Sequence, residues 1–429
     1  MLLSGPRVRE QLAALADAAS NLELLVATDG VGRRECWQRA AEGARGDVLV
    51  AFDAVAEPTV EAVERLAADV RAGAALAFPT ITSANREVHG YRATPDGALW
   101  PIVEAGSEPD AVALDCLAAR PATFRSLPAW DVVAGPYERQ VVDAARAIGP
   151  VVRSSCKVAR RSCGPSLSIV VCTRDRADEV AECVDACVEL DLAGNDAELI
   201  VVDNGSSDGT AVLLVERAAR YGDRVRVVRE PLAGLSLARN AGAAVATGEL
   251  LTFLDDDARP GPGWLEHLRL SFLDPGVAIA GGPIYGLWPD GRPAGFPPAT
   301  AAPYLGILDR GDAPHDSARP EDGPWGGNWT GRRSLIDALG GFDARFGAGE
   351  LGNLGGEEVH LGWRLLERGL GRLRFVPGAA VGHRAPKARV LERYVLLRAY
   401  RCGIEDIRLR EALGRDDGPA IDASAGNAA

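Results

Sequence analysis

The chain has 429 residues, of which 47% are hydrophobic and 25% are charged, so it suits a globular protein of two or three domains. Its net charge of −13 argues against nucleic acid or an anionic membrane as the main ligand. It contains no apolar run of about 18 residues, and its N-terminus lacks the apolar core of a signal peptide. The 8 cysteines are scattered and form no C-x-x-C pair, which favours a reducing compartment. We therefore expect a cytoplasmic protein, with peripheral contact at the inner face of the membrane as an alternative.

Three segments of residues 1–160 are similar to later segments of the same chain. The matched pairs are 22–30 with 197–205, 46–58 with 248–260, and 120–131 with 332–343. In the second pair Asp53 corresponds to Asp255, but Val55 corresponds to Asp257. Chance similarity between alanine-rich segments is the alternative. We interpret residues 1–160 as a degenerate, non-catalytic α/β copy of the domain that follows, with a structural or acceptor-binding role.

Strands and helices alternate from residue 167 onward. The expected strands are 167–172, 198–202, 225–229 and 250–254, and the expected helices are 178–190, 210–221 and 235–246. Such alternation predicts a mostly parallel sheet with helices on both faces. Ligands of such sheets bind beyond the carboxyl ends of the strands, where the polar turns of this chain lie.

The second half of the chain contains a long segment without periodicity. Residues 285–325 are rich in proline and glycine, which predicts a lid, a binding loop or disorder. A helix is expected from about residue 334, residues 355–364 are expected to open another, and 391–413 is expected to form a third, with a strand over 373–376 and a disordered tail over 416–429. The expected domains are 1–160, then 165–390, then a C-terminal helix and tail over 391–429.

Three consecutive carboxylates follow an apolar strand at Asp255, Asp256 and Asp257. Like charges repel at this spacing, so folding alone gives little reason for them. A hard divalent cation that carries a phosphorylated ligand would explain them, because such cations prefer carboxylate oxygens. A solvated acidic turn is the alternative.

The motifs of residues 165–386, taken in order, resemble those of the inverting family-2 glycosyltransferases of the GT-A fold. The resemblance rests on the segments 167–208, 248–257, 328–333 and 356–363 and on His383. It implies an α/β GT-A domain, a nucleotide-diphosphate sugar donor, a divalent metal and a carboxylate base. The chain would then be a hexosyltransferase-like enzyme that acts with inversion.

The resemblance also implies which residues bind the donor. They are Thr173, Arg174, Arg176, Asp203, Asn204, Gly205, Arg239, Asn240, Asp255, Asp256, Asn328 and Arg332. Ordinary turns, helix entries and exposed salt bridges are the alternatives for these positions. Arg174 stands where the family usually has an uncharged residue, so the base of the donor stays open among UDP-, GDP- and dTDP-linked sugars.

The metal ligands implied by the resemblance are Asp257, Asp255 and His383. An imidazole among oxygen ligands suits Mn²⁺ as well as Mg²⁺. A structural role is the alternative for a single histidine near a strand end.

The catalytic base implied by the resemblance is Glu358, at the start of a helix where the family more often has aspartate. It would take the proton of an acceptor hydroxyl during in-line attack on the anomeric carbon. Glu357 beside it would contact the sugar or the acceptor. Two acids at a helix N-terminus are also favoured by the helix dipole, which is the alternative.

Two other functions remain open at this point. A sugar-nucleotide nucleotidyltransferase would need a glycine-rich loop with a phosphate-binding lysine, which Thr173-Arg174-Asp175-Arg176 does not provide. A non-catalytic sugar-nucleotide-binding protein fits residues 1–160 better than the rest. The acceptor is a glycan, a lipid-linked molecule or a small molecule. Residues 391–413 combine arginines with aliphatic residues, which fits peripheral membrane contact or packing on the protein itself.

Overall fold

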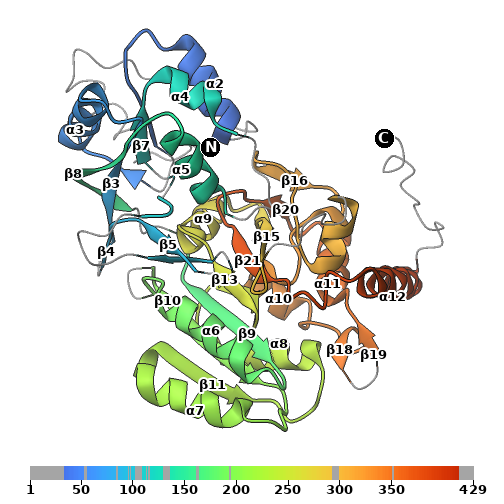
Figure 1. The fold of residues 1–429 in the computed structure, drawn as a ribbon. Coiled ribbons are helices and arrows are strands. Elements are labelled where there is room, and N and C mark those ends of the chain that lie inside the picture. Colours follow the sequence, from blue (N-terminus) through green and yellow to red (C-terminus); the bar gives the residue numbers. More distant parts are fainter. Residues whose placement is uncertain are drawn as a thin grey trace.

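A computed structural model describes residues 33–52, 56–83, 86–94, 96, 98–101, 109–112, 114, 116–128, 136–160, 164–192, 195–291, 299–349 and 352–414. Within these ranges the chain forms two large β-sheets, one in each half (Figure 1). The predicted match of residues 22–30 and the predicted tail both lie outside the described residues.

The second half of the chain is built on an eight-stranded mixed sheet with the order β11-β10-β9-β12-β17-β14-β20-β16. The first four strands in this order are mutually parallel, and the rest are mixed. The strands are β9 (Leu167–Thr173), β10 (Ala197–Asp203), β11 (Val225–Arg229), β12 (Leu250–Asp255), β14 (Val277–Gly281), β16 (His315–Ser317), β17 (Asn328–Arg332) and β20 (Arg372–Phe375).

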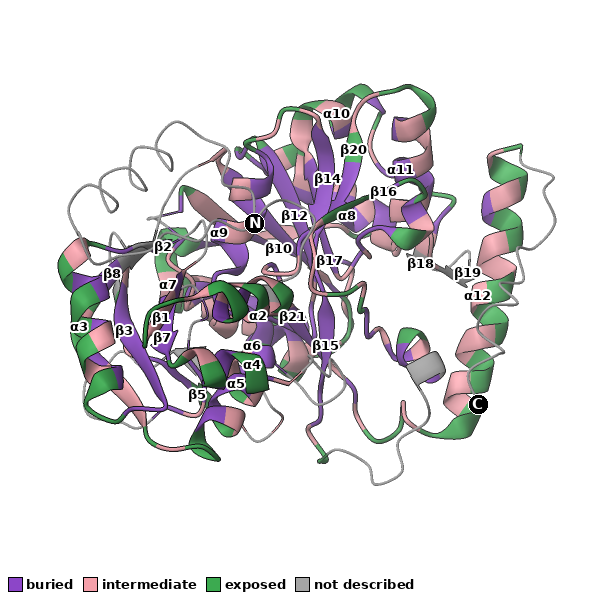
Figure 2. Ribbon diagram, turned by 90° about the horizontal axis from the view of Figure 1, so that it is seen from above, coloured by how far each residue is buried: buried purple, intermediate pink, exposed green. Residues whose placement is uncertain are grey.

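Helices cover both faces of this sheet, as expected for strands that are apolar on both sides. In β9, Ile169 and Val171 pack against one set of helices and Val170 packs against the other. On the first face lie α6 (Ala177–Val188), α7 (Thr210–Tyr221) and α9 (Trp264–Ser271). On the second lie α8 (Leu235–Val245), α10 (Arg333–Ala338) and α11 (Glu357–Glu367). Figure 2 shows the strands of this sheet as a buried layer.

The described residues of the long segment 285–325 contain more regular structure than its composition predicts. It contains the end of β15 (Ile284–Leu287), the 3₁₀ turns η2 (Ala299–Leu305) and η3 (Pro320–Asp322), and β16. β15 joins β13 (Ala258–Pro260) and β21 (Val381–Arg384) in a separate three-stranded sheet. These short strands pair with partners far along the chain, so local periodicity does not reveal them.

The first half is built on a six-stranded sheet with the order β1-β7-β3-β8-β2, and β4 pairs with β3. Helices α2 (Arg33–Gly43), α3 (Val60–Arg71), α4 (Pro121–Ser126) and α5 (Tyr137–Arg146) accompany it. The strands are β1 (Leu49–Phe52), β2 (Ala56–Glu57), β3 (Leu76–Ser83), β4 (Arg86–Val88), β7 (Cys116–Ala119) and β8 (Val151–Arg160).

The two sheets share strand order, strand direction and register. The series β1-β7-β3-β8 has the same succession of antiparallel, antiparallel and parallel pairs as β12-β17-β14-β20. Leu49 pairs with Ala119 in the first sheet, and Leu251 pairs with Gly331 in the second. The match of segments 46–58 and 248–260 sets Leu49 on Leu251, so the two pairs correspond.

A second register correspondence concerns the strands that follow the acidic turn. Ala56 in β2 pairs with Arg160 in β8, and Ala258 in β13 pairs with His383 in β21, both antiparallel. Arg160 therefore holds the place in the first half that His383 holds in the second. These registers support the hypothesis of an internal copy.

The first half also touches the second through a small hairpin of β5 (Tyr91–Ala93) and β6 (Leu99–Pro101). The carbonyl of Asp96 accepts a 2.7 Å hydrogen bond from the backbone N–H of Trp288. Ala98 is buried in one apolar cluster with Tyr285 and Leu305. The hairpin thus packs beside the three-stranded sheet that carries His383.

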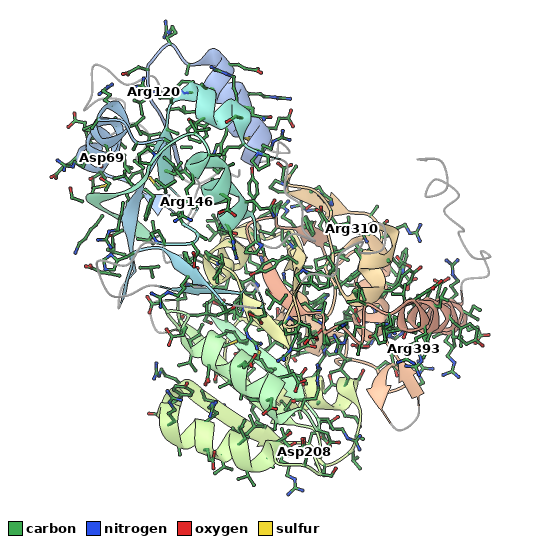
Figure 3. The ribbon with its side chains drawn as sticks, viewed as in Figure 1. Asp69, Arg120, Arg146, Asp208, Arg310 and Arg393 are labelled. Atoms are coloured by element: carbon green, nitrogen blue, oxygen red, sulfur yellow. The ribbon has the colours of Figure 1, made fainter. Side chains whose placement is uncertain are left out.

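The helix α12 (Glu392–Ala412) ends the described part of the chain and lies at the edge of the molecule (Figures 1 and 2). Figure 3 shows Arg393 at this helix and Asp208, which follows β10 in the chain, at the lower edge of the picture. Among the described residues, no helix is both long enough and apolar enough to cross a membrane.

Candidate active site

Polar residues gather where β9, β10 and β12 end. The parallel register sets Asp203 beside Thr173, and Asp255 beside Cys172. The carboxyl ends of the three strands therefore meet at one edge of the sheet, as the sequence predicts.

Asp255, Asp257 and His383 form a cluster that offers ligands for a metal ion. One ligand atom from each lies within 4.8 Å of the others. His383 reaches the acids because β21 pairs with β13, which directly follows the acidic turn. Oδ1 of Asp257 is buried, accepts no hydrogen bond among the described residues, and lies 3.1 Å from Nε2 of His383. Two carboxylates, one of which has this unsatisfied buried oxygen, and one imidazole fit a cation such as Mn²⁺ or Mg²⁺.

Opposite charges hold Asp257 in its ionised form. Burial alone would raise its pKa, but His383, Arg176 and Arg389 keep the pKa of this carboxyl well below its usual range. Burial also disfavours the charged form of His383, and Asp257 outweighs that effect and raises the pKa of its imidazole. Nη2 of Arg176 lies 2.6 Å and Nη2 of Arg389 lies 3.2 Å from Oδ2 of Asp257.

Asp256 is not part of this cluster and bonds the last residue of β9. It accepts a 2.7 Å hydrogen bond from Oγ1 of Thr173 and a 2.5 Å bond from Nη1 of Arg176. Burial raises the pKa of Asp256 to about 7 in spite of Arg176. Arg176 thus bridges two of the three acids, and Arg389, which sequence reasoning missed, supplies a second cation. Its position six residues after His383 was the available signal.

Glu357 and Glu358 open helix α11 after Gly356, whose φ of +92° suits glycine. Glu357 is buried and pairs with buried Arg239 at 2.6 Å. Burial raises the pKa of Glu357, and the neighbouring Glu358 raises it further. Arg239 also lies 5.5 Å from the ring centres of Phe253 and of Phe342. Arg239, which was predicted as a phosphate ligand, is thus paired with the first residue of α11.

Glu358 is oriented by one of its two carboxylate oxygens. Oε1 accepts a 3.2 Å hydrogen bond from the backbone N–H of Gly326, whose carbonyl accepts a 3.2 Å bond from Nη2 of Arg239. Oε2 is shielded from water and has no hydrogen-bond partner among the described residues. One oxygen is therefore fixed while the other can accept a proton.

Gly326 and Gly327 connect the two sides of the site. A Cβ on Gly326 would lie 2.7 Å from Nη2 of Arg239 and 3.3 Å from Cδ of Glu358. A Cβ on Gly327 would lie 2.7 Å from Oδ2 of Asp255. Two consecutive glycines thus touch the candidate base on one side and the candidate metal ligands on the other. Sequence reasoning missed both, although a Gly-Gly pair directly before Asn328 was visible.

The turn after β10 is held by its own polar residues. Oδ1 of Asp203 accepts from the N–H of Ser206 at 3.1 Å. The amide of Asn204 donates to the carbonyls of Glu230 and Leu232 and accepts from the N–H of Gly234. Asn204 therefore holds the segment 230–234 by three hydrogen bonds to its backbone. Its contact with the donor stays a prediction.

Glycine and arginine flank the same turn. Gly205 has φ +71°, and a Cβ there would lie 2.9 Å from the carbonyl oxygen of Pro231, so close packing requires glycine. Arg174 is exposed, with its Nε 3.6 Å from Oδ2 of Asp175. Asp175 in turn accepts from the N–H groups of Ser207 and Asp208. Arg174 is therefore able to reach a ligand at this edge.

Three predicted donor residues have hydrogen-bond partners within the protein, and their donor contacts stay predictions. The amide of Asn240 exchanges two hydrogen bonds with the backbone of Phe342. Asn328 is fully buried, and its side chain bonds Trp264 and two backbone carbonyls. Arg332 pairs in register with Leu250, at the start of β12. Its guanidinium donates hydrogen bonds to the backbone carbonyls of Phe272, Asp274 and Val277. The structure does not bring Arg332 to the acidic edge, because β17 runs antiparallel to β12.

Comparisons with known proteins bear on this half of the chain. The family model described as Glycosyl transferase family 2 matches residues 168–340. The pre-mycofactocin glycosyltransferase of Mycobacterium tuberculosis is 32% identical over 225 residues, which cover 51% of this chain and 43% of the relative. The validoxylamine A glucosyltransferase of Streptomyces hygroscopicus subsp. jinggangensis is 32% identical over 235 residues, which cover 48% of this chain and 52% of the relative.

One solved structure is the mannosyltransferase PcManGT from Pyrobaculum calidifontis in complex with GDP-Man and Mn²⁺. It has a TM-score of 0.42 and 20% identity, and the match covers 60% of this chain and 67% of that one. The chain spans about half the length of the curated relatives it matches.

Proposed function

We propose that this chain, whose residues 168–340 match the family model described as Glycosyl transferase family 2, transfers a sugar from a nucleotide-diphosphate sugar to an acceptor hydroxyl. The observation that carries the proposal is the arrangement around Gly326 and Gly327. A set of metal-type ligands lies on one side, and a carboxylate with one unpaired oxygen lies on the other.

The donor would lie against the acidic edge of the sheet. Asp255, Asp257 and His383 would hold a divalent cation there, which would neutralise the charge of the departing diphosphate. Arg176 and Arg389 already lie beside Asp257, so their guanidinium groups are placed to pair with phosphate oxygens. Arg174 and Asp203 border the same edge and would contact the nucleoside.

Glu358 would act as the base. The acceptor oxygen attacks the anomeric carbon from the side opposite the diphosphate, the bond from that carbon to the diphosphate oxygen breaks, and the configuration inverts. The hydroxyl proton passes to Oε2 of Glu358, while the N–H of Gly326 holds Oε1. Arg239 and Glu357 would keep the start of α11 in place and exclude water from this side.

The proposal is tested by measuring release of nucleoside diphosphate from UDP-, GDP- and dTDP-sugars with Mn²⁺ and a panel of acceptors. Glu358→Gln should fold normally and lose about 10²- to 10⁴-fold in transfer rate. Glu367→Gln, at the far end of the same helix, is the matched control and should retain activity. Normal turnover by Glu358→Gln would remove Glu358 as the base. Release of pyrophosphate from a nucleoside triphosphate would identify a nucleotidyltransferase instead.

The metal role is tested separately by donor binding. Asp257→Asn keeps the shape of the side chain but removes its negative charge. It should abolish the Mn²⁺-dependent part of donor binding in calorimetry. Donor binding that is the same with and without Mn²⁺ in the unmodified protein would reject the metal site.

For the first half of the chain we propose a copy of the same sheet without the metal site. The supporting observations are the common strand order and the two common registers. Arg160 holds the position of His383, and Val55 holds the position of Asp257 in the sequence match. The contact of Asp96 with Trp288 favours a structural or acceptor-side role, beside the strands that carry His383.

A further inference from the structure

The outer face of α12 is the largest group of exposed apolar side chains in the described part of the chain. Ten large hydrophobic residues are exposed in the whole described part of the chain, and five of them lie between residues 391 and 407. Leu396 is 62% exposed, Tyr400 69% and Ile407 57%. The spacing of 4 and 7 residues sets these three side chains on one side of the helix, with Leu397 next to them.

The inner face of the same helix packs on the protein. Tyr394 and Val395 pack against the apolar cluster that includes Leu305, and Leu409 is buried. The helix is therefore anchored to its domain by one face and presents the other to solvent. This arrangement excludes a purely internal role for the exposed residues.

The arginines of α12 fall into two groups, those that form ion pairs within the helix and those that are exposed without an ion pair to any described residue. Arg398 pairs with Glu405 at 2.8 Å, and Arg410 pairs with Asp406 at 2.9 Å. By contrast, the arginines among the exposed apolar residues are exposed and form no ion pair or hydrogen bond with any described residue. They are Arg393, Arg401 and Arg408. The acids at 392 and 411 stand near the two ends of the face, so its centre is basic and apolar.

We propose that α12 docks this face on an anionic lipid surface. Leu396, Tyr400 and Ile407 would enter the headgroup region, and the arginines would contact lipid phosphates through their long side chains. A second copy of the chain fits the face less well, because an isologous contact would oppose unpaired arginines to one another. The chain as a whole carries a net charge of −13, so its overall charge does not favour an anionic surface, and the attraction proposed here is local to the basic face of α12.

The docking would hold the candidate site near the membrane. α12 begins at Glu392, three residues after Arg389, which contacts Asp257. The inference does not depend on sugar transfer, since it rests on the exposed face alone.

The test is sedimentation of the full chain with vesicles of phosphatidylcholine, with and without phosphatidylglycerol. Binding is expected only with phosphatidylglycerol, and it should weaken as salt rises. Replacing the three unpaired arginines by glutamine should weaken binding by about 100-fold, because each contributes about fivefold near an anionic surface. The matched control replaces three exposed arginines of the first half by glutamine, namely Arg92, Arg120 and Arg139.

The apolar contribution is tested by Tyr400→Asp, with Val215→Asp on α7 as the control at a residue of similar exposure. Tyr400→Asp should reduce vesicle binding at least about tenfold, and Val215→Asp should not. The inference is overturned if the unmodified chain does not sediment with phosphatidylglycerol vesicles, or if the α12 variants bind them equally well. It is also overturned if the α12 variants change the sedimentation coefficient of the free protein, since that outcome shows a second copy on this face.

Discussion

Replacement of Gly327 by alanine is the sharpest available perturbation of the candidate metal site, because it changes no ligand. The new Cβ would lie 2.7 Å from Oδ2 of Asp255, whereas ordinary contacts begin at 3.4 Å. The carboxylate must therefore move by 3.4 − 2.7 = 0.7 Å. Metal–ligand distances tolerate deviations of only about 0.2 Å. We expect Gly327→Ala to weaken Mn²⁺ binding by about 10- to 100-fold, as displaced supports of metal ligands do elsewhere.

The cost to stability should be small, because Asp255 can rotate its carboxylate instead of shifting the backbone. A loss of about 1 kcal/mol is expected, at the low end of overpacking effects. Mn²⁺ affinity is measured by calorimetry and stability by urea denaturation. Gly403→Ala is the matched control, since a Cβ at that position meets nothing within 4 Å. Unchanged Mn²⁺ affinity in Gly327→Ala would refute the assignment of Asp255 as a ligand.

Three further predictions follow from the buried charges and from the proposed copy. Arg239→Gln should lower the free energy of unfolding by about 3–5 kcal/mol in urea denaturation, because Glu357 loses its buried partner; a loss below about 1 kcal/mol would contradict this. Asp316→Asn should cost at most about 1 kcal/mol at pH 7, since its ion pairs with the two arginines of β20 are partly exposed and screened. Partial burial opposes ionisation, but those arginines hold the pKa of Asp316 below its usual value. The stabilisation by Asp316 is therefore present above the pKa that this carboxyl has in the unfolded chain, and it fades as pH falls through the pKa in the folded protein. The free energies of unfolding of the unmodified protein and of Asp316→Asn should then become equal in acid. A difference that persists in acid would argue against the ion pairs. Calorimetric titration should give one Mn²⁺ site per chain and none in Asp257→Asn; a second site would contradict the loss of metal ligands in residues 1–160.

The regular elements between residues 167 and 255 were predictable from the sequence. The expected helix 210–221 and strand 225–229 coincide with α7 and β11. The central strands β9 and β12 are buried along almost their whole length, the edge strand β11 alternates apolar and charged residues, and each helix carries one apolar face, so local periodicity was sufficient. The segment 285–325 was not predictable, because β16 and β15 exist only through pairing with β20 and β21, about 60 to 100 residues further on.

Part of the candidate site was likewise predictable from the sequence, and part of it was not. Asp255, Asp257 and His383 were expected together, and the structure brings them together. Arg239 was expected at a phosphate, yet it pairs with Glu357 from a helix 118 residues away. The packing of α8 against the start of α11 decides this contact, and no local pattern encodes it.

The first half of the chain offers an argument about why the acids after β12 are retained. On the proposed duplication, the pairings of β1, β2, β7 and β8 keep the registers of the second sheet although Val55 and Arg160 stand in place of Asp257 and His383. A sheet of this register therefore folds without a carboxylate at that position. Asp257 is only 1% exposed, and His383, Arg176 and Arg389 keep its pKa low against the effect of burial, although a sheet of this register does not require such an arrangement. Two carboxylates, an imidazole and two arginines suit a hard cation held together with a diphosphate, which is the ligand that we propose for this edge.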